Sequence, residues 1–341
     1  MRTKIIATIG PKSESPEILS SLVKAGMSIA RMNFSHCTYD EYRLRQKLLK
    51  AAAAKLKTKV EIMQDLQGPR IRVGKLPAEG IELKDRQVYQ FSYSSTGKSS
   101  TGVIPISDQY LHADIKKGEP FFLASGELEL RVEEVKQGKI FARVERGGIL
   151  FSNKGINVPL TKMRAGGLTP KDVKDVKFAL QQKVDYIALS FVQGPEDILK
   201  LRKVIGKAPV KIIAKIERAL ALRYIDEIIQ VSDGIMVARG DLGVEMPMAE
   251  LPIIQKNIIR HAHWHAKPAI LATQIMTSMI NHHHPTRAEV SDIANGIFDG
   301  ADALMLSDET AAGQYPVRTV EMMKKIIVRI ENYINADNLL N

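Results

Sequence analysis

Polar and charged side chains stand at the ends of most of the apolar, β-branched runs of this sequence. They are Arg31 and Asn33, Asp65, Ser190, Lys215 and Glu217, Arg239 and Asp241, Thr273, and Ser307 with Glu309. A strand buried on both faces needs no polar residue at its end for stability, whereas barrel enzymes draw catalytic groups from that end of several strands. We therefore expect these side chains to share one site.

Two carboxylates and a lysine in this set indicate the chemistry. Glu217 and Asp241 follow successive apolar runs, so their oxygens can converge on one hard cation such as Mg²⁺. Lys215 precedes Glu217 by two residues, and on a strand both side chains point to the same face. A lysine beside a metal and arginines is suited to stabilising a phosphoryl group in transfer. Gly240 is expected to open a tight turn, with amides of a following helix free to bind a carboxylate. These residues predict Mg²⁺-dependent handling of a small phosphorylated acid.

Eight short apolar runs supply the strands that would position this site, and most are followed by an amphipathic helical stretch. The expected strands are 3–9, 27–33, 60–65, 184–190, 210–216, 233–238, 268–273 and 301–306; the expected helices are 15–25, 38–56, 169–182, 194–205, 249–265, 286–298 and 316–334. Continuous apolar runs are typical of parallel strands buried on both faces. The pattern predicts the α/β class and a (β/α)8 TIM barrel. An open doubly wound sheet is the alternative, but no Gly-x-Gly-x-x-Gly follows the first run.

Residues 74–159 interrupt this alternation with an all-β pattern. Its clearest part is a hairpin with arms 127–132 and 140–144. Alternation with a period of two predicts a half-exposed antiparallel sheet. We therefore expect a β-rich lid domain at 74–159, inserted after the third strand of a catalytic barrel formed by 1–73 and 160–341.

The composition bounds the class of protein. The chain has 341 residues, of which 45% are hydrophobic and 26% charged, as in ordinary globular proteins. A single cysteine, Cys37, excludes an intramolecular disulfide framework and favours a reducing compartment. No apolar run approaches the ~20 residues that cross a bilayer, and the N-terminus turns polar too early for a signal peptide. We expect a cytoplasmic protein that does not bind a membrane.

The formal net charge of +11 attracts either nucleic acid or small anions. The Lys and Arg residues are scattered, without a block of five or six, and only 6% of residues are aromatic. This pattern favours a basic surface that does not bind nucleic acid. His261, His263 and His265 have no evident carboxylate or thiol partner, and the consecutive histidines 282–284 have no defined coordination geometry. Neither set is expected to form a transition-metal site.

Five motifs, in order, resemble those of the pyruvate kinase family. They are Met32–His36 after Arg31, Ile213–Glu217, Val237–Glu245, Ala272–Gln274 and Pro285–Asp292. The resemblance extends from the first residues to about residue 334. It implies transfer of the phosphoryl group of phosphoenolpyruvate to ADP, giving pyruvate and ATP, with Mg²⁺ or Mn²⁺ and usually K⁺. It also implies a homo-oligomer assembled through barrel surfaces.

The resemblance assigns roles in metal and phosphate binding by motif position. Glu217 and Asp241 resemble the family's divalent-metal ligands. Lys215 resembles the lysine that neutralises the phosphoryl group during transfer. Arg31 and Arg72 match the arginines that hold phosphates.

Further roles concern the rest of the substrate. Gly240 and Asp241 would offer backbone amides to the substrate carboxylate. Thr273 resembles the threonine beside the enolate carbon, where a proton must be delivered after transfer. Ser307 and Glu309 match members of the proton-relay set.

The nucleotide edge of the site is implied by four further matches. Thr8, Pro11 and His36 correspond to residues of the barrel rim. Lys154 corresponds to the lid residue that reaches the nucleotide.

The third-strand motif departs from K⁺-dependent relatives, which have Asp-Thr-Lys-Gly-Pro-Glu-Ile-Arg where residues 65–72 read Asp-Leu-Gln-Gly-Pro-Arg-Ile-Arg. The resemblance places the monovalent-cation site at Asn33, Ser35, Asp65 and Leu66. Leu66 lacks the usual hydroxyl, and Arg70 puts a fixed cation where a carboxylate usually stands. K⁺-independent relatives carry a lysine there with a leucine like Leu66. We therefore expect Arg70 to replace K⁺.

Family members usually continue into a C-terminal α/β domain that binds effectors. Because the resemblance ends near residue 334, we expect that domain to be absent, and no activation through its effector site.

Two alternative functions stay open. The first is a Mg²⁺-dependent lyase or aldolase acting on a 2-oxo acid, which would use similar barrel-end carboxylates. Arg72, Lys154 and Thr8 argue against it, because a lyase needs no nucleotide subsite. The second is a non-catalytic paralogue whose basic surface binds nucleic acid or another anionic partner. The intact metal, phosphate and proton-handling residues argue against that reading.

Overall fold

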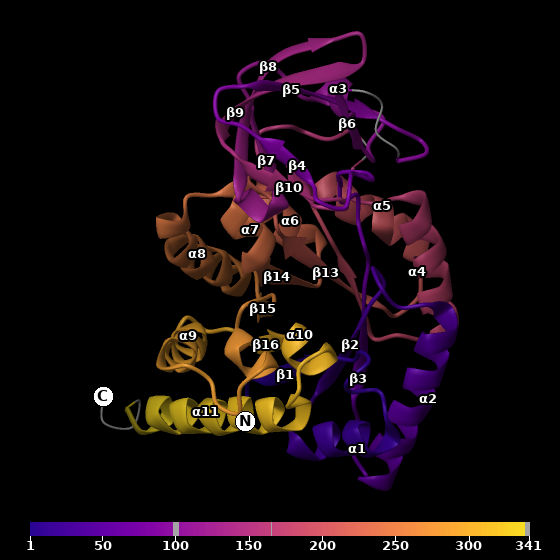
Figure 1. The fold of residues 1–341 in the computed structure, drawn as a ribbon. Coiled ribbons are helices and arrows are strands. Elements are labelled where there is room, and N and C mark those ends of the chain that lie inside the picture. Colours follow the sequence, from indigo (N-terminus) through magenta and orange to yellow (C-terminus); the bar gives the residue numbers. More distant parts are fainter. Residues whose placement is uncertain (98–101, 165, 338–341) are drawn as a thin grey trace.

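Eight parallel strands close into a barrel in the computed structural model, which describes residues 1–97, 102–164 and 166–337 (Figure 1). Around the barrel they run β1 (Lys4–Thr8), β16 (Ala303–Leu306), β15 (Ala269–Ala272), β14 (Gly234–Ala238), β13 (Lys211–Ile216), β12 (Tyr186–Leu189), β3 (Glu61–Asp65) and β2 (Ile29–Asn33). Each strand lies within one of the eight expected runs. The prediction of a (β/α)8 barrel is confirmed, and the open sheet is excluded by the pairing of β1 with both β2 and β16.

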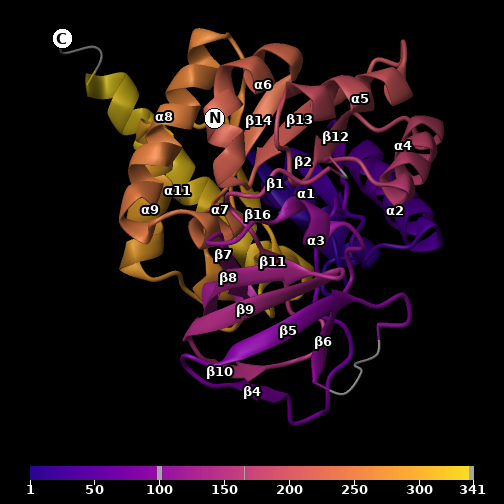
Figure 2. The same cartoon turned by 90° about the horizontal axis from the view of Figure 1, so that it is seen from above.

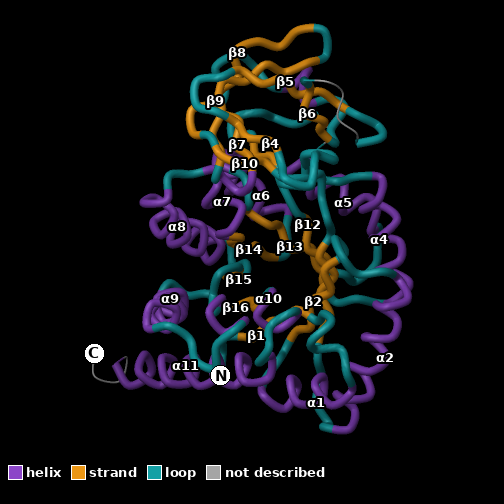
Figure 3. Tube along the Cα trace, viewed as in Figure 1, coloured by secondary structure: helices purple, strands orange, loops and turns teal. Residues whose placement is uncertain are grey.

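The helices form a ring around the barrel strands (Figure 3). They are α1 (Pro16–Ala25), α2 (Tyr39–Lys55), α4 (Pro170–Gln182), α5 (Pro195–Ile205), α6 (Ile225–Val231), α8 (Leu251–Trp264), α9 (Arg287–Phe298) and α11 (Pro316–Asp337). The side chains of Thr38, Thr169 and Thr286 each complete a capping box, which fixes where α2, α4 and α9 begin. Within the described part of the chain, no helix combines the length and apolarity needed to span a membrane.

Three short helices of the barrel were not predicted. α6 follows a 3₁₀ segment (Ala219–Tyr224), α7 (Arg239–Glu245) follows β14 directly, and α10 (Asp308–Ala311) follows β16. Each spans at most seven residues, too few for a helical period to stand out in the sequence.

The expected β-rich segment lies between β3 and α4 and is called the insert below. Its strands are β4 (Ile81–Leu83), β5 (Val88–Tyr93), β6 (Val103–Ile106), β7 (Pro120–Leu123), β8 (Leu128–Lys136), β9 (Lys139–Arg146), β10 (Gly148–Leu150) and β11 (Ile156–Asn157). The expected hairpin is the antiparallel pair β8–β9. β6 differs from the expectation, because it pairs with β5 in parallel. Two short helical segments, α3 (Leu111–Asp114) and a 3₁₀ turn (Ala124–Gly126), interrupt the strands.

The barrel and the insert have separate hydrophobic cores. One core lies between the barrel strands and their helices, and a second fills the barrel interior with side chains such as Met63, Met236 and Met305. The insert has its own core, which includes Phe91 and Phe121. The boundaries 1–73, 74–159 and 160–341 stay a prediction, and residues 98–101, 165 and 338–341 within them lie outside the described residues.

The insert lies beyond one end of the barrel, with α7 and β7 at the junction (Figure 2). It departs after β3 ends at Asp65 and returns before α4 begins at Pro170, so it emerges from the carboxyl ends of the strands. α7 packs against the 3₁₀ turn of the insert. The elements therefore bring the insert next to the strand ends that carry the predicted site residues.

Candidate active site

A cluster of buried charges occupies the carboxyl ends of β2, β3 and β13. Lys215 Nζ lies 3.1 Å from Asp65 Oδ1 and 2.9 Å from Glu217 Oε1. Arg31 Nε donates to Asp65 Oδ2 at 2.7 Å. All four side chains are at least nine-tenths buried. The expectation that Lys215 and Glu217 point to one side of the strand agrees with this contact.

The charges in this cluster stabilise one another. Burial alone would raise the pKa of Asp65, but Lys215 and Arg31 together lower it. Burial alone would lower the pKa of Lys215, but Asp65 and Glu217 raise it. Burial raises the pKa of Glu217 despite the opposing charge of Lys215, with the nearby Asp241 acting in the same direction. Lys215 is therefore held as an ammonium, which makes it a source of positive charge and a poor base.

Ser190 and Phe191, at the end of β12, position this cluster through contacts that the sequence did not reveal. Lys215 Nζ donates to Ser190 Oγ at 2.8 Å, and Ser190 Oγ donates to the Leu66 carbonyl at 2.7 Å. The Phe191 amide, in a residue with a φ of 56°, donates to Glu217 Oε2 at 2.7 Å. Ser190 was recognised by its place at a strand end. Phe191 acts through its backbone, for which its side chain gives no signal.

Gly240 lies in the first turn of α7, so the prediction of a tight turn there was wrong. Helix α7 begins immediately at the end of β14, and the Gly240 amide donates to Thr273 Oγ1 at 2.7 Å. A Cβ atom on Gly240 would lie 3.4 Å from the same oxygen. Thr273 has a φ of 68°, and its hydroxyl donates to the Ala272 carbonyl. The two residues therefore fix each other's position.

Arg239 holds the turn that contains Thr273. Its guanidinium donates to the Thr273 carbonyl at 2.9 Å and to Asp292 Oδ1 of α9 at 2.6 Å. Its Nε is buried and has no hydrogen-bond partner among the described residues. Because Asp292 is 53 residues away, sequence spacing gave no indication of this pair.

One pocket at the barrel mouth is lined by most of the predicted site residues. These are Arg31, Asn33, Ser35, His36, Asp65, Leu66, Arg70, Arg72, Lys215, Glu217, Asp241 and Thr273. Arg70 Nη2 lies 3.3 Å from Asp241 Oδ1 on this wall. Burial and the neighbouring Arg70 lower the pKa of Arg72. Four cationic side chains and three carboxylates thus face a common space that a small anion and a cation could share.

The other predicted residues lie around this pocket without lining it. Thr8 Oγ1 accepts from Arg31 Nη1 at 2.9 Å and donates to the Leu306 carbonyl, so it holds the Arg31 guanidinium in place. Pro11 and Lys154 are exposed, on the barrel rim and on the insert respectively.

Ser307 and Glu309 lie at the start of α10. Glu309 is almost fully buried, and its carboxylate accepts from the amides of Ser307 and Met276. The Glu309 carboxylate therefore joins the loops that follow β15 and β16.

The comparisons with known proteins agree with this arrangement. A family model described as the pyruvate kinase barrel domain matches residues 1–320. Pyruvate kinase from Thermococcus litoralis is 46% identical, over 97% of this chain and 70% of its own length. Pyruvate kinase 2 from Synechocystis is 44% identical, over 97% of this chain and 57% of its own length. Pyruvate kinase from Thermotoga maritima is 41% identical, over 96% of this chain and 71% of its own length.

The chain belongs to the pyruvate kinase family. It spans between 57% and 72% of the length of the similar family members. The predicted resemblance is therefore confirmed.

The donor set of the pocket suits the divalent cation of this family. Glu217 and Asp241 both line it and interact electrostatically. Mg²⁺ is commonly held by one or two carboxylates, with substrate phosphates and water completing its shell. Glu217 and Asp241 fit that pattern. Within the described ranges there is no group of three or more His, Cys, Asp and Glu side chains that could hold a metal ion.

The histidines at the carboxyl end of α8 do have carboxylate partners, contrary to the expectation. His261 Nδ1 and His265 Nε2 lie 2.7 Å and 3.2 Å from Asp226 Oδ1, and His263 Nε2 lies 3.2 Å from Asp302 Oδ2. Asp226 belongs to α6, which the sequence did not predict. These contacts tie α8 to its neighbours.

Proposed function

We propose that this chain transfers the phosphoryl group of phosphoenolpyruvate to ADP, giving pyruvate and ATP. The observation that carries the proposal is the buried Lys215 ammonium, 2.9 Å from Glu217, in a pocket that also contains Asp241, Arg31 and Arg72. Phosphoryl transfer needs mainly alignment of two anions and neutralisation of their charge. This pocket supplies fixed positive charge from Arg31, Arg72 and Lys215.

Glu217 and Asp241 would hold Mg²⁺ or Mn²⁺ in this reaction. Bound there, the cation would neutralise charge on the phosphoryl oxygens. The Phe191 amide keeps one Glu217 oxygen in place, and the other oxygen faces Lys215. Lys215 stays charged as the bond between phosphorus and the enol oxygen breaks and a bond to the ADP oxygen forms. Its ammonium stabilises the negative charge that spreads over the transferred group.

Thr273 would deliver the proton that completes the reaction. The enolate left by transfer takes up a proton at its terminal carbon and becomes the ketone of pyruvate. The Thr273 hydroxyl lines the pocket, and the Gly240 amide and Arg239 hold its residue in place. Ser307 and Glu309 would form the outer part of the relay. The Asp241 amide would lie on the substrate's carboxylate side, whereas the Gly240 amide already donates to Thr273 Oγ1.

The nucleotide would bind at the rim between the barrel and the insert. His36 lines the pocket, Pro11 is exposed on the same rim, and Thr8 supports Arg31. Lys154 is exposed on the insert, and the backbone carbonyl of its neighbour Asn153 accepts from Arg72 Nη1 at 3.0 Å. This contact joins the insert to Arg72 and supports Lys154 as the insert residue that reaches the nucleotide.

Arg70 would make the reaction independent of K⁺. Its guanidinium lines the pocket beside Asp241, where it supplies a fixed positive charge. Leu66 has an apolar side chain, while Asn33, Ser35 and Asp65 keep oxygens near the pocket. Equal turnover with and without K⁺, at matched ionic strength, is the expected result. A large stimulation by K⁺ would contradict this assignment.

A coupled assay with lactate dehydrogenase tests the main proposal. Pyruvate formation is expected only when phosphoenolpyruvate, ADP and a divalent cation are all present. Consumption of a 2-oxo acid without ADP would instead favour the lyase or aldolase. Absence of turnover together with salt-dependent binding to a duplex would favour the non-catalytic paralogue.

We also infer a cytoplasmic homo-oligomer that assembles through barrel surfaces. The apolar side chains exposed on α8, such as Ile253 and Trp264, support the assembly, and the single cysteine, Cys37, supports a reducing compartment. Sedimentation velocity over a range of protein concentrations is the measurement, and a monomer at all concentrations would contradict the assembly.

A further inference from the structure

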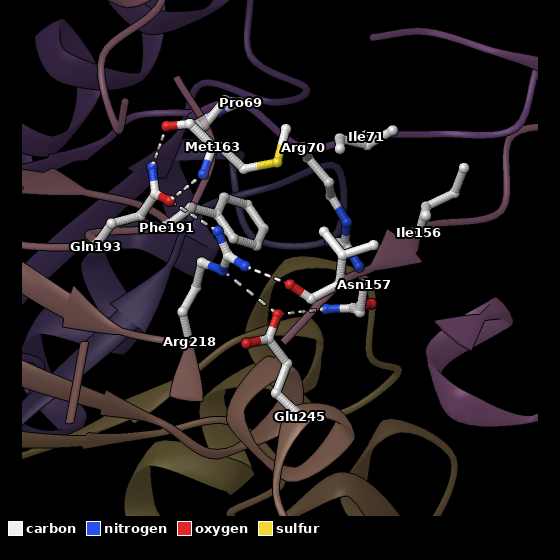
Figure 4. A pocket seen from close by; sticks show the side chains of 11 residues that line it. Pro69, Arg70, Ile71, Ile156, Asn157, Met163, Phe191, Gln193, Arg218 and Glu245 are labelled. Carbon is white, nitrogen blue, oxygen red and sulfur yellow. Dashed lines mark hydrogen bonds and ion pairs between the residues drawn. The ribbon is translucent and has the colours of Figure 1, made fainter. Parts of the chain in front are cut away.

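The two chain segments that connect the insert to the barrel meet at one small cavity (Figure 4). Pro69, Arg70 and Ile71 of the outgoing segment form part of its wall. The return segment, residues 157–163, forms another part, and Phe191, Gln193, Arg218 and Glu245 complete the wall from the barrel side. Arg70 also lines the catalytic pocket, so the two spaces are neighbours.

Arg218 fixes the return segment to the barrel. Its Nη2 donates to the carbonyls of Val158 and Thr161, at 2.6 Å and 3.0 Å. Its Nη1 donates to Gln193 Oε1 at 3.0 Å. Gln193 in turn exchanges two hydrogen bonds with the backbone of Met163. A side chain of the barrel thus satisfies three acceptors, two of which are backbone carbonyls of the return segment.

Glu245 extends the same network to α7 and the insert. Its Oε1 lies 3.5 Å from Arg218 Nε and accepts from Asn157 Nδ2 of β11 at 3.4 Å. Its Oε2 accepts from the Ala219 amide at 2.9 Å. Figure 4 shows Arg218 between Gln193 and the Glu245–Asn157 pair. The side chains of Arg218 and Glu245 are 5% and 2% exposed, so the loss of one partner would leave the other as an unpaired buried charge.

This network is directly connected to both carboxylates proposed to bind the metal. Arg218 follows Glu217 in the chain, and Glu245 lies one turn after Asp241 on α7. A shift of Arg218 or of α7 would therefore move one carboxylate relative to the other.

We infer that the buried Arg218–Glu245 pair is a positioning device that couples the return segment of the insert to the spacing of Glu217 and Asp241. The inference rests on the proposed function only in taking those two carboxylates as the metal ligands. Neither Arg218 nor Glu245 touches the reacting atoms. Their effect is exerted through the geometry of the site, as expected for groups that orient metal ligands.

The test compares the wild-type chain with Arg218→Met, which keeps an unbranched apolar stem but removes the charge and the donors. We expect the dissociation constant for Mn²⁺, measured by electron paramagnetic resonance without substrates, to rise about tenfold. Hydrogen exchange is expected to rise in peptides that cover residues 157–163 and 239–246. Arg218→Lys keeps the charge opposite Glu245 and should recover part of the affinity. Unchanged Mn²⁺ affinity in Arg218→Met, even with faster exchange, would overturn the coupling.

Arg202→Met is the control for the loss of an arginine–carboxylate pair away from the site, although this pair is more exposed, at 37% and 30%. Arg202 of α5 also pairs with a carboxylate, Asp233 at 2.9 Å, and donates to a backbone carbonyl, that of Val231. Asp233 immediately precedes β14, at the opposite end of the barrel from the site. This variant should keep wild-type Mn²⁺ affinity and wild-type exchange in both peptides. An equal loss of affinity in the control would overturn the inference, because the effect would then be one of general stability.

If Arg218→Met does not fold, the double variant Arg218→Met with Glu245→Gln carries the test, because it leaves no unpaired buried charge. The same loss of Mn²⁺ affinity is expected, and wild-type affinity would overturn the inference. Wild type that binds Mn²⁺ but forms no pyruvate would contradict the proposed function alone, since the metal and exchange measurements do not depend on turnover.

Discussion

The barrel mouth and the insert use their charged side chains in opposite ways. At the mouth, Arg31, Asp65, Lys215 and Glu217 are in contact with one another and are at least nine-tenths buried. On the insert, three ion pairs cross the β8–β9 hairpin in solvent. They are Arg131–Glu145, Arg143–Glu133 and Arg146–Glu129, with side chains between 36% and 57% exposed.

This difference shows which charges are not explained by their contribution to stability. Exposed pairs exchange contacts with water at little net gain or cost. Buried charges lose their hydration, so a well-packed apolar set in the same place would often be as stable or more stable. A buried cluster of two cations and two carboxylates therefore indicates a function that needs them, and the predictions below test that contrast.

Lys215→Met should have the largest effect. We expect turnover with phosphoenolpyruvate and ADP to fall by roughly 10³-fold or more, because fixed charge on the transferred group is lost. The free energy of unfolding should fall by about 3–5 kcal/mol, since Asp65 and Glu217 lose their buried partner, while the fold is retained. The coupled assay and urea denaturation measure the two effects. Turnover within tenfold of wild type would show that Lys215 does not stabilise the transferred group.

The barrel and its site-bearing strand ends could be predicted because they depend on local pattern. Continuous apolar runs gave the eight strands, and the polar residue at the end of each gave most of the pocket. Lys215 and Glu217 are two residues apart on one strand, so their shared direction follows from strand geometry.

The contacts that position the site could not be predicted, because each joins elements far apart in the chain. Asp292 is paired with Arg239 across 53 residues, and Asn157 reaches Glu245 across 88. α7 was not predicted because it is too short to show a helical period. For the same reason, the helical position of Gly240 was not predicted. Asp226, the partner of two histidines, lies on the equally short α6. Sequence pattern thus located the groups at the site but did not identify the groups that hold them.

Asp65 should make stability depend on acidity, an effect of intermediate size. Its pKa in the folded state is lowered by Lys215 and Arg31 against the opposing effect of burial. A carboxyl with a lowered folded pKa contributes stability above its unfolded pKa of about 3.9, and that contribution is lost as the pH falls through the folded value. We expect the free energy of unfolding of wild type to fall below about pH 4, with a shallower fall in Asp65→Asn.

Urea denaturation across this pH range is the measurement, and Glu145→Gln on the insert is the control. Glu145 is exposed and its pair is screened by solvent, so its substitution should leave the wild-type profile unchanged. Identical acid profiles for wild type and Asp65→Asn would mean that the buried cluster gives no more pH-dependent stability than the surface pairs.

The smallest effect is expected at the Arg131–Glu145 pair of the insert. Two hydrogen bonds join these side chains, with Arg131 Nη2 at 3.0 Å from Glu145 Oε2, and the Glu145 contact raises the pKa of Arg131. A double-mutant cycle with Arg131→Ala and Glu145→Ala should nevertheless give a coupling energy below about 1 kcal/mol, because both groups remain hydrated when unpaired. Turnover should be unaffected, since neither residue lies at the junction with the barrel. A coupling energy of about 3–5 kcal/mol, as large as the loss expected for Lys215→Met, would contradict this distinction between the two regions. It would mean that two hydrogen bonds between the partners affect the strength of an ion pair more than its exposure to solvent does.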